Sequence, residues 1–112
     1  MEKTLNIDGK SVRFRANAGT VLRYRAWFGH DLIKDITELS EASAGGKAMT
    51  SEALVVALNI AYTMARQADP GVPDDPMDWI DGFDVFPIAE VVPELTRLWA
   101  ESMHITVQEK NV

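Results

Sequence analysis

The stretch "SEALVVALNIAYTMARQA", residues 51–68, constrains the fold of this chain more than any other segment. A helix on the surface of a globular protein carries one apolar stripe, whereas this segment is apolar on almost every side. Such a helix has to be surrounded by other elements. The sequence therefore predicts a central core helix over 51–68, whose first turn is capped by the hydroxyl of Thr50 or Ser51.

A β-hairpin is predicted near the N-terminus from "LNIDGKSVRF". Asp8-Gly9 suits a two-residue type I′ turn, in which both residues need a positive φ. This turn pairs Leu5 with Val12 and Ile7 with Lys10. An isolated hairpin is marginal in water, so its apolar face should be buried against helices. That face comprises Leu5, Ile7, Val12 and Phe14, and the solvent face comprises Thr4, Asn6, Ser11, Arg13 and Arg15.

Two further helices are predicted between the hairpin and the central helix. Thr20 is expected to cap a helix over 21–28, which Gly29 ends. Asp31 is expected to cap the next helix, over 32–42, whose apolar stripe faces the core. A loop, "SAGGK", separates this helix from the central one. The stripe consists of Leu32, Ile33, Ile36 and Leu39.

The C-terminal third is predicted to contain two helices. Asp75-Pro76 reads as the N-cap and first residue of a short helix that Gly82 ends. A last helix begins near Phe86-Pro87, and Pro93 either kinks it or marks a restart. Residues 104–112 are predicted as a tail or a short added strand. The buried side of the last helix is expected to comprise Ile88, Val91, Val92, Leu95, Leu98 and Trp99.

Size and composition fit one soluble globular domain. The chain has 112 residues, of which 46% are hydrophobic and 25% charged. It lacks cysteine, which excludes disulfides and thiolate metal sites. No apolar run approaches the ~18 residues of a membrane span, and the N-terminus does not resemble a signal peptide. We expect a single mainly α domain (α+β) over 1–112, with the hairpin at 3–16 and about four to five helices within 20–103.

Charge is distributed unevenly along the chain. The net charge of −6 opposes nucleic-acid binding, although residues 1–34 contain seven basic and three acidic residues. Residues 69–94, here called the acidic segment, contain eight acidic residues and no basic one. Within it, "DWIDGFDVFP" mixes aspartates with core-sized apolar residues. This combination is typical either of a docking surface for a basic partner or of a solvated loop above aromatic core residues.

Signatures of enzymes and metal sites are missing from the sequence. There is no Gly-rich phosphate loop, no G-x-S-x-G and no H-E-x-x-H. The aspartates around Gly82 do not match a calcium loop, because Trp79 and Ile88 fall at ligand positions. The two histidines, His30 and His104, are distant in sequence, and His30 is interpreted as an exposed loop residue. We expect no catalytic residue, no cofactor and no metal.

Two long stretches resemble the small tail assembly chaperones of long-tailed phages and prophages of Gram-positive bacteria. The first is "ANAGTVLRYRAWFGHDLIKD", residues 16–35, and the second is "ARQADPGVPDDPMDWIDGFDVFPIAEVVPELTRLW", residues 65–99. Both occur in the family's order, behind the hairpin, and together the resemblance covers nearly the whole chain. Val72 and Ile80 are apolar exchanges relative to the family's pattern.

The resemblance implies a non-enzymatic helical chaperone in the host bacterial cytoplasm. Such proteins bind the tape-measure protein before the tube polymerises, help to recruit tail tube protein and leave the finished virion. We predict that the acidic segment binds the partner, with Trp79 as its buried anchor, and that a basic face meets it in a homo-oligomer. The partner-binding candidates are Asp78, Trp79, Asp81, Phe83, Asp84 and Phe86. The self-association candidates are Arg13, Arg15, Arg23, Arg25 and Trp27.

Two other functions fit parts of the sequence. A structural tail or head–tail connector protein, retained in the virion, is equally small, soluble and oligomeric. A small DNA-binding regulator would need "LIKDITEL", residues 32–39, as its recognition helix, and this segment is too acidic for phosphate contact.

Overall fold

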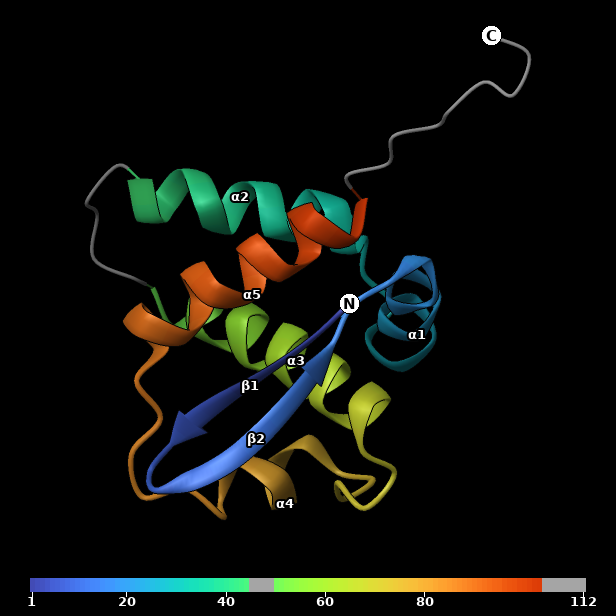
Figure 1. Cartoon of the computed structure of the whole chain (residues 1–112). Coiled ribbons are helices and arrows are strands. Elements are labelled where there is room, and N and C mark those ends of the chain that lie inside the picture. The colour runs from blue at the N-terminus through green and yellow to red at the C-terminus, as the bar shows by residue number, and fades with distance from the viewer. Residues whose placement is uncertain (45–49, 104–112) are drawn as a thin grey trace, which may run out of the picture.

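The computed structural model describes residues 1–44 and 50–103 (Figure 1). It confirms the predicted class, because a two-stranded antiparallel hairpin precedes helices in a mainly α fold. Ser43 and Ala44, predicted as the start of the "SAGGK" loop, belong instead to the preceding helix, because neither residue stops a helix. Predictions for residues 45–47 of that loop and for 104–112 lie outside the described residues. The elements are β1 (Glu2–Ile7), β2 (Lys10–Arg15), α1 (Ala18–Phe28), α2 (Leu32–Ala44), α3 (Ser51–Ala68), α4 (Pro76–Ile80) and α5 (Ile88–Met103).

The predicted central helix is α3, which packs against α1, α2, α4, α5 and β2 (Figure 1). Six consecutive residues, 60–65, are buried, so the helix is enclosed on all sides there. Its N-terminal half is more open, and Val55 is exposed. Thr50 is the N-cap, since its Oγ1 accepts a hydrogen bond from the Ala53 N–H at 3.1 Å.

The hairpin has the predicted turn and register. Asp8 and Gly9 have φ values of 54° and 75°, and Leu5 pairs with Val12. On the apolar face Ile7 and Phe14 are buried, while the other two residues are half-buried. The helices provide the cover that a lone hairpin lacks, because β2 lies against α3 and β1 against α5.

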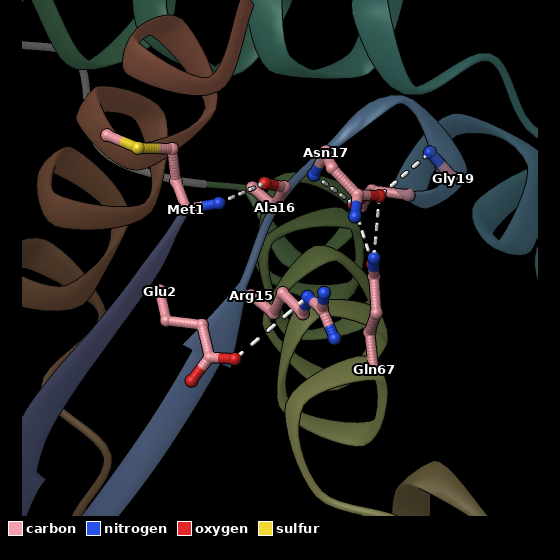
Figure 2. Close-up of polar contacts among 8 residues, drawn as sticks. Met1, Glu2, Arg15, Ala16, Asn17, Gly19 and Gln67 are labelled. Atoms are coloured by element: carbon pink, nitrogen blue, oxygen red, sulfur yellow. Dashed lines mark hydrogen bonds and ion pairs between the residues drawn. The ribbon is translucent and has the colours of Figure 1, made fainter.

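The start of α1 differs from the prediction. Asn17, not Thr20, is the N-cap: its Oδ1 accepts from the Gly19 N–H at 2.8 Å, while the Thr20 Oγ1 accepts from the Asn17 N–H at 3.0 Å. Thr20 thus serves as the third residue of a capping box, which lengthens the helix by one turn. Gln67 of α3 joins this box by donating to Asn17 Oδ1 at 2.8 Å (Figure 2). Gly29 ends α1 in the left-handed conformation, as predicted.

The apolar stripe of α2 also needs a correction. Leu32, Ile36 and Leu39 are buried, but Ile33 is 55% exposed. The buried side of this helix instead includes Asp35, which a pattern of apolar residues does not reveal. Asp31 caps the helix as predicted, with its Oδ1 accepting from the Ile33 N–H at 3.0 Å.

The C-terminal helices follow the prediction with one exception. Asp75 caps α4 and Pro76 occupies its first turn. The predicted apolar residues of α5 are buried from Val91 to Trp99, and Ile88 is half-buried. A restart at Pro93 was one predicted alternative, and it is wrong, because α5 runs through this residue without interruption. Proline has no N–H, so the Ala89 carbonyl loses the hydrogen bond that residue 93 would normally donate. Pro93 and Ala89 are both exposed, so water can replace this bond and the cost in stability is limited.

Candidate partner-binding surface

The acidic segment begins where α3 ends, and its aspartates shape the local backbone. Asp69 follows the last turn of α3, and its Oδ1 accepts from the Gly71 N–H at 2.9 Å. Asp75 Oδ1 accepts from the Met77 N–H at 3.0 Å and so starts α4. Short polar side chains that bond to a backbone N–H two residues on favour such turns. Two of the eight acidic residues are therefore accounted for by turn and cap formation.

Trp79 anchors this segment to the core. Its side chain is only 7% exposed and its ring lies 5.9 Å from that of Tyr62 on α3, between centroids. Phe83 and Phe86 pack edge-on against the same indole at 5.3 and 5.7 Å. These tilted arrangements are the ones that aromatic quadrupoles favour. The prediction that Trp79 is a buried anchor is confirmed.

The tip of the hairpin covers the segment from the other side. The Lys10 ammonium lies 5.2 Å from the centroid of the Phe83 ring and donates to the Gly82 carbonyl. Asp8 Oδ2 accepts from the Asp84 N–H at 2.9 Å. The sequence does not reveal this contact, because nothing in a local pattern links residues that are more than 70 positions apart. Phe83 thus lies between the Trp79 indole and the tip of the hairpin.

Two acidic residues of the segment form ion pairs within the protein. Arg66 pairs with the highly exposed Asp74, and this hydrogen bond raises the pKa of the Arg66 guanidinium. Glu94 pairs with Lys3 of β1 and with Arg97 at 3.0 Å. The hydrogen bond from Lys3 is the main reason that the pKa of Glu94 is lowered. Lys3, from the basic N-terminal region, thus neutralises one carboxylate of the acidic segment within the same molecule.

The predicted partner-binding residues fall into two groups. Asp78, Asp81 and Asp84 are exposed, and none of them forms an ion pair within the part of the chain that the structure describes. Trp79 is buried, and Phe83 and Phe86 are half-buried. The aromatic residues therefore build the segment, and the aspartates are the part that a partner can reach.

Two apolar residues beside these aspartates are exposed and were not among the predicted site residues. Met77 is 67% exposed and Val85 is 59% exposed. A signal for Met77 existed: it lies two positions from Trp79, which places it on the opposite side of α4 from the buried anchor. We define the acidic patch as Met77, Asp78, Asp81, Asp84 and Val85. It offers both negative charge and apolar area.

The predicted self-association residues are all exposed and come from two elements, β2 and α1. Arg13 and Arg15 extend from the solvent face of β2, where the Arg15 guanidinium lies 4.0 Å from a Glu2 carboxylate oxygen (Figure 2). Arg23 on α1 donates to the Gly19 carbonyl at 3.3 Å. Arg25 lies in the last turn of α1, where its charge is favourable to the helix dipole.

Trp27 lies next to the acidic segment. Its ring is 41% exposed and packs against Tyr62 at 6.1 Å and beneath the Arg66 guanidinium at 5.6 Å. A surface cavity of about 350 Å³ adjoins it and is also lined by Asp74 and Pro76. The structure therefore brings this self-association candidate close to the partner-binding candidates.

A buried polar cluster joins α1 and α2. The Tyr24 hydroxyl donates to Asp35 Oδ2 at 2.7 Å, and the exposed His30 ring places Nδ1 3.0 Å from the same oxygen. Burial, and then the hydrogen bond to Asp35, raise the pKa of the Tyr24 hydroxyl. His30 is an exposed loop residue as predicted, but the sequence did not reveal its contact with Asp35. The geometry of the cluster fixes the α1–α2 corner.

Residues 1–44 and 50–103 contain no group of three or more His, Cys, Asp or Glu side chains placed to hold a metal ion. Among these residues no helix is both long and apolar enough to cross a membrane. No family model, curated protein or solved structure matches this chain.

Proposed function

We propose that this protein is a non-enzymatic tail assembly chaperone of a long-tailed phage or prophage. It acts in the host bacterial cytoplasm, where it binds the tape-measure protein and helps to recruit tail tube protein. The proposal rests on the two stretches, 16–35 and 65–99, that resemble this family. The second stretch contains the whole acidic patch.

One observation favours partner binding over a solvated loop. Within "DWIDGFDVFP" the aromatic residues are buried or half-buried, while the three aspartates remain exposed and free of ion pairs inside the described residues. A loop that only covers the core does not need three like charges beside exposed Met77 and Val85, because their mutual repulsion opposes folding. A client segment with basic and apolar residues provides the missing complement.

The experiment is co-purification of the client after co-expression with the tape-measure protein from the same genome. In the test variant Asp78, Asp81 and Asp84 are changed to Lys together. The matched control changes three exposed acidic residues of α2 and α3, namely Glu38, Glu41 and Glu52, to Lys. We expect the test variant to lose the client and the control to keep it, although both change the net charge by the same amount.

The presence or absence of the protein in the finished virion separates this function from the connector alternative. A chaperone is absent from purified virions, whereas a connector is present in a fixed copy number that mass spectrometry detects. Equal client binding by the wild type and both variants contradicts the assignment of the acidic patch. Recovery of the protein from virions contradicts the chaperone itself.

A further inference from the structure

The hairpin has two edges, and its hydrogen-bonding pattern determines which backbone N–H and C=O groups point outward from each edge. Met1 and Ala16 exchange two bonds: the Ala16 N–H donates to the Met1 carbonyl at 2.9 Å, and the Met1 amino group donates to the Ala16 carbonyl at 3.2 Å (Figure 2). Hydrogen-bonded and non-hydrogen-bonded pairs alternate along an antiparallel ladder. The pairs 2–15, 4–13 and 6–11 are therefore the non-bonded ones.

It follows that backbone N–H and C=O groups of Glu2, Thr4 and Asn6 point outward from β1. Those of Ser11, Arg13 and Arg15 point outward from β2. The sheet has two strands within the described residues, so neither row of groups pairs with a further strand there. An edge of this kind is a template for another strand, and proteins usually block it.

The β1 edge opens onto a groove between β1 and α5. This groove has a volume of about 280 Å³ and an apolar floor that includes Leu5, Ile7 and Val91. Lys3 also lines this groove, and its side chain is on the core-facing side of β1. A charge in this position normally discourages the pairing of an edge strand with a further strand. Here Glu94 neutralises that charge. Glu90 also lines the groove and forms no ion pair within residues 1–44 and 50–103.

We infer that β1 is a dimerisation edge, which pairs antiparallel with β1 of a second copy about a two-fold axis at Thr4. In this register Thr4 faces Thr4 and Glu2 faces Asn6, so all three outward-facing residues of each strand are used. The ladder gains about six backbone hydrogen bonds. The two hairpins then form one four-stranded sheet.

The distribution of charge favours a second copy of the chain as the partner and β1, not β2, as the pairing edge. In this register Lys3 of the second copy lies opposite Leu5, so that Lys3, which is paired with Glu94 of its own copy, also meets the carboxylate of Glu90 in the groove. No like charges face each other on the solvent side, because Glu2 meets Asn6. The same two-fold arrangement at β2, centred on Arg13, would place two guanidinium groups in contact, and like charges directly opposite are destabilising.

This contact differs from the predicted meeting of basic and acidic faces. Two different faces make a heterologous contact that continues into a ring or a filament, whereas identical edges related by a two-fold axis close at a dimer. The inference concerns the protein alone and is independent of its proposed role in tail assembly.

The test is sedimentation velocity over a concentration series, with two matched proline variants. Thr4→Pro removes an N–H that points out of β1, and Arg13→Pro removes the corresponding N–H of β2, its cross-strand neighbour. Neither N–H belongs to the β1–β2 ladder, and proline is tolerated at such edge positions. We expect the wild type and Arg13→Pro to dimerise and Thr4→Pro to be monomeric. Glu90→Lys should raise the dimer dissociation constant about tenfold, because it faces Lys3 of the second copy.

Amide hydrogen exchange of the wild type provides a readout that does not depend on any variant. The Thr4 and Asn6 amides should be protected in the dimer and lose protection on dilution, while those of Ser11 and Arg13 exchange fast throughout. Monomers at every concentration, assembly that grows beyond dimers, or equal behaviour of the two proline variants would overturn the inference.

Discussion

Truncation of Trp79 to alanine tests how the acidic segment is held on the protein. The indole is 7% exposed and contacts Tyr62, Phe83 and Phe86. A tryptophan buries roughly 150–250 Å², which at about 25 cal/mol per Å² corresponds to about 4–6 kcal/mol of transfer free energy. Because α4 is short and flanked by loops, partial collapse of the site should reduce this value. We expect a loss of about 3–4 kcal/mol, within the range of large core truncations.

The assay is urea unfolding followed by circular dichroism at 222 nm, with Trp27→Ala as the control. Trp27 is 41% exposed and contacts fewer aromatic rings, so its truncation should have a clearly smaller effect, about 1 kcal/mol. If Trp79→Ala unfolds at the same urea concentration as the wild type, or no earlier than Trp27→Ala, the anchor assignment is refuted. Trp79 would then belong to the partner-binding surface instead.

Three further predictions concern the remaining contacts. Phe14→Ala should destabilise the protein by about 3–5 kcal/mol, measured by the same urea unfolding, because Phe14 is fully buried; an unchanged midpoint would show that the hairpin is not part of the core. Tyr24→Phe should cost about 1–3 kcal/mol in thermal unfolding at pH 7, because it removes the hydroxyl donor from the buried Asp35, and a neutral effect would mean that another donor replaces it. The pKa of Glu94 is lower in the folded than in the unfolded protein, so Glu94 stabilises the fold above its unfolded-state pKa, and this stability is lost as the pH falls through its folded-state pKa. Lys3→Met should therefore reduce the dependence of the unfolding free energy on pH in this acidic range. An unchanged dependence contradicts the pairing of Lys3 with Glu94.

Local signals in the sequence predicted most of the elements. The Asp8-Gly9 turn determined the hairpin register, and Thr50, Asp31 and Asp75 each cap the helix they were assigned to. These features depend on backbone geometry within a few residues, so the sequence contains the relevant information directly. The apolar character of 51–68 on almost every side was sufficient to place the core helix.

The errors arise where two local solutions compete or where distant elements meet. Asn17 and Thr20 are both good capping residues, and the box uses both, which adds a turn to α1. Asp35 is buried because Tyr24 on another helix supplies a hydrogen-bond donor, and a stripe of apolar residues does not contain that information. The contact of Lys10 with Phe83 likewise depends on tertiary packing.

The candidate surface was predicted only in part for the same reason. The sequence placed aromatic residues and aspartates together in one segment and identified Trp79 as its buried anchor, but it did not show how far Phe83 and Phe86 are covered. It also gave no prediction for Met77, which is exposed. The orientation of a short helix is set by the largest side chain that it can bury, and only the structure shows which neighbouring residues pack against that side chain.

The acidic patch also leads to a prediction in which stability and function oppose each other. Asp81 is the C-cap of α4, and its charge lies at the negative end of the helix dipole and in a segment that contains no basic residue. Asp81→Asn removes this repulsion and keeps a side chain of the same size. It should therefore raise the free energy of unfolding slightly, by about 0.3–1 kcal/mol at low salt.

Under the proposed function the same substitution should weaken co-purification of the tape-measure protein, because it removes one of the three charges that we propose as the client's contact. Residues kept at a cost to stability are typical of functional sites, so the two effects together support the patch. Urea unfolding at low and at high salt measures the first effect, and co-purification measures the second. A variant that is more stable and binds the client as well as the wild type would show that Asp81 lies outside the contact. A variant that is less stable at low salt would show that the charge has a structural role at the end of α4.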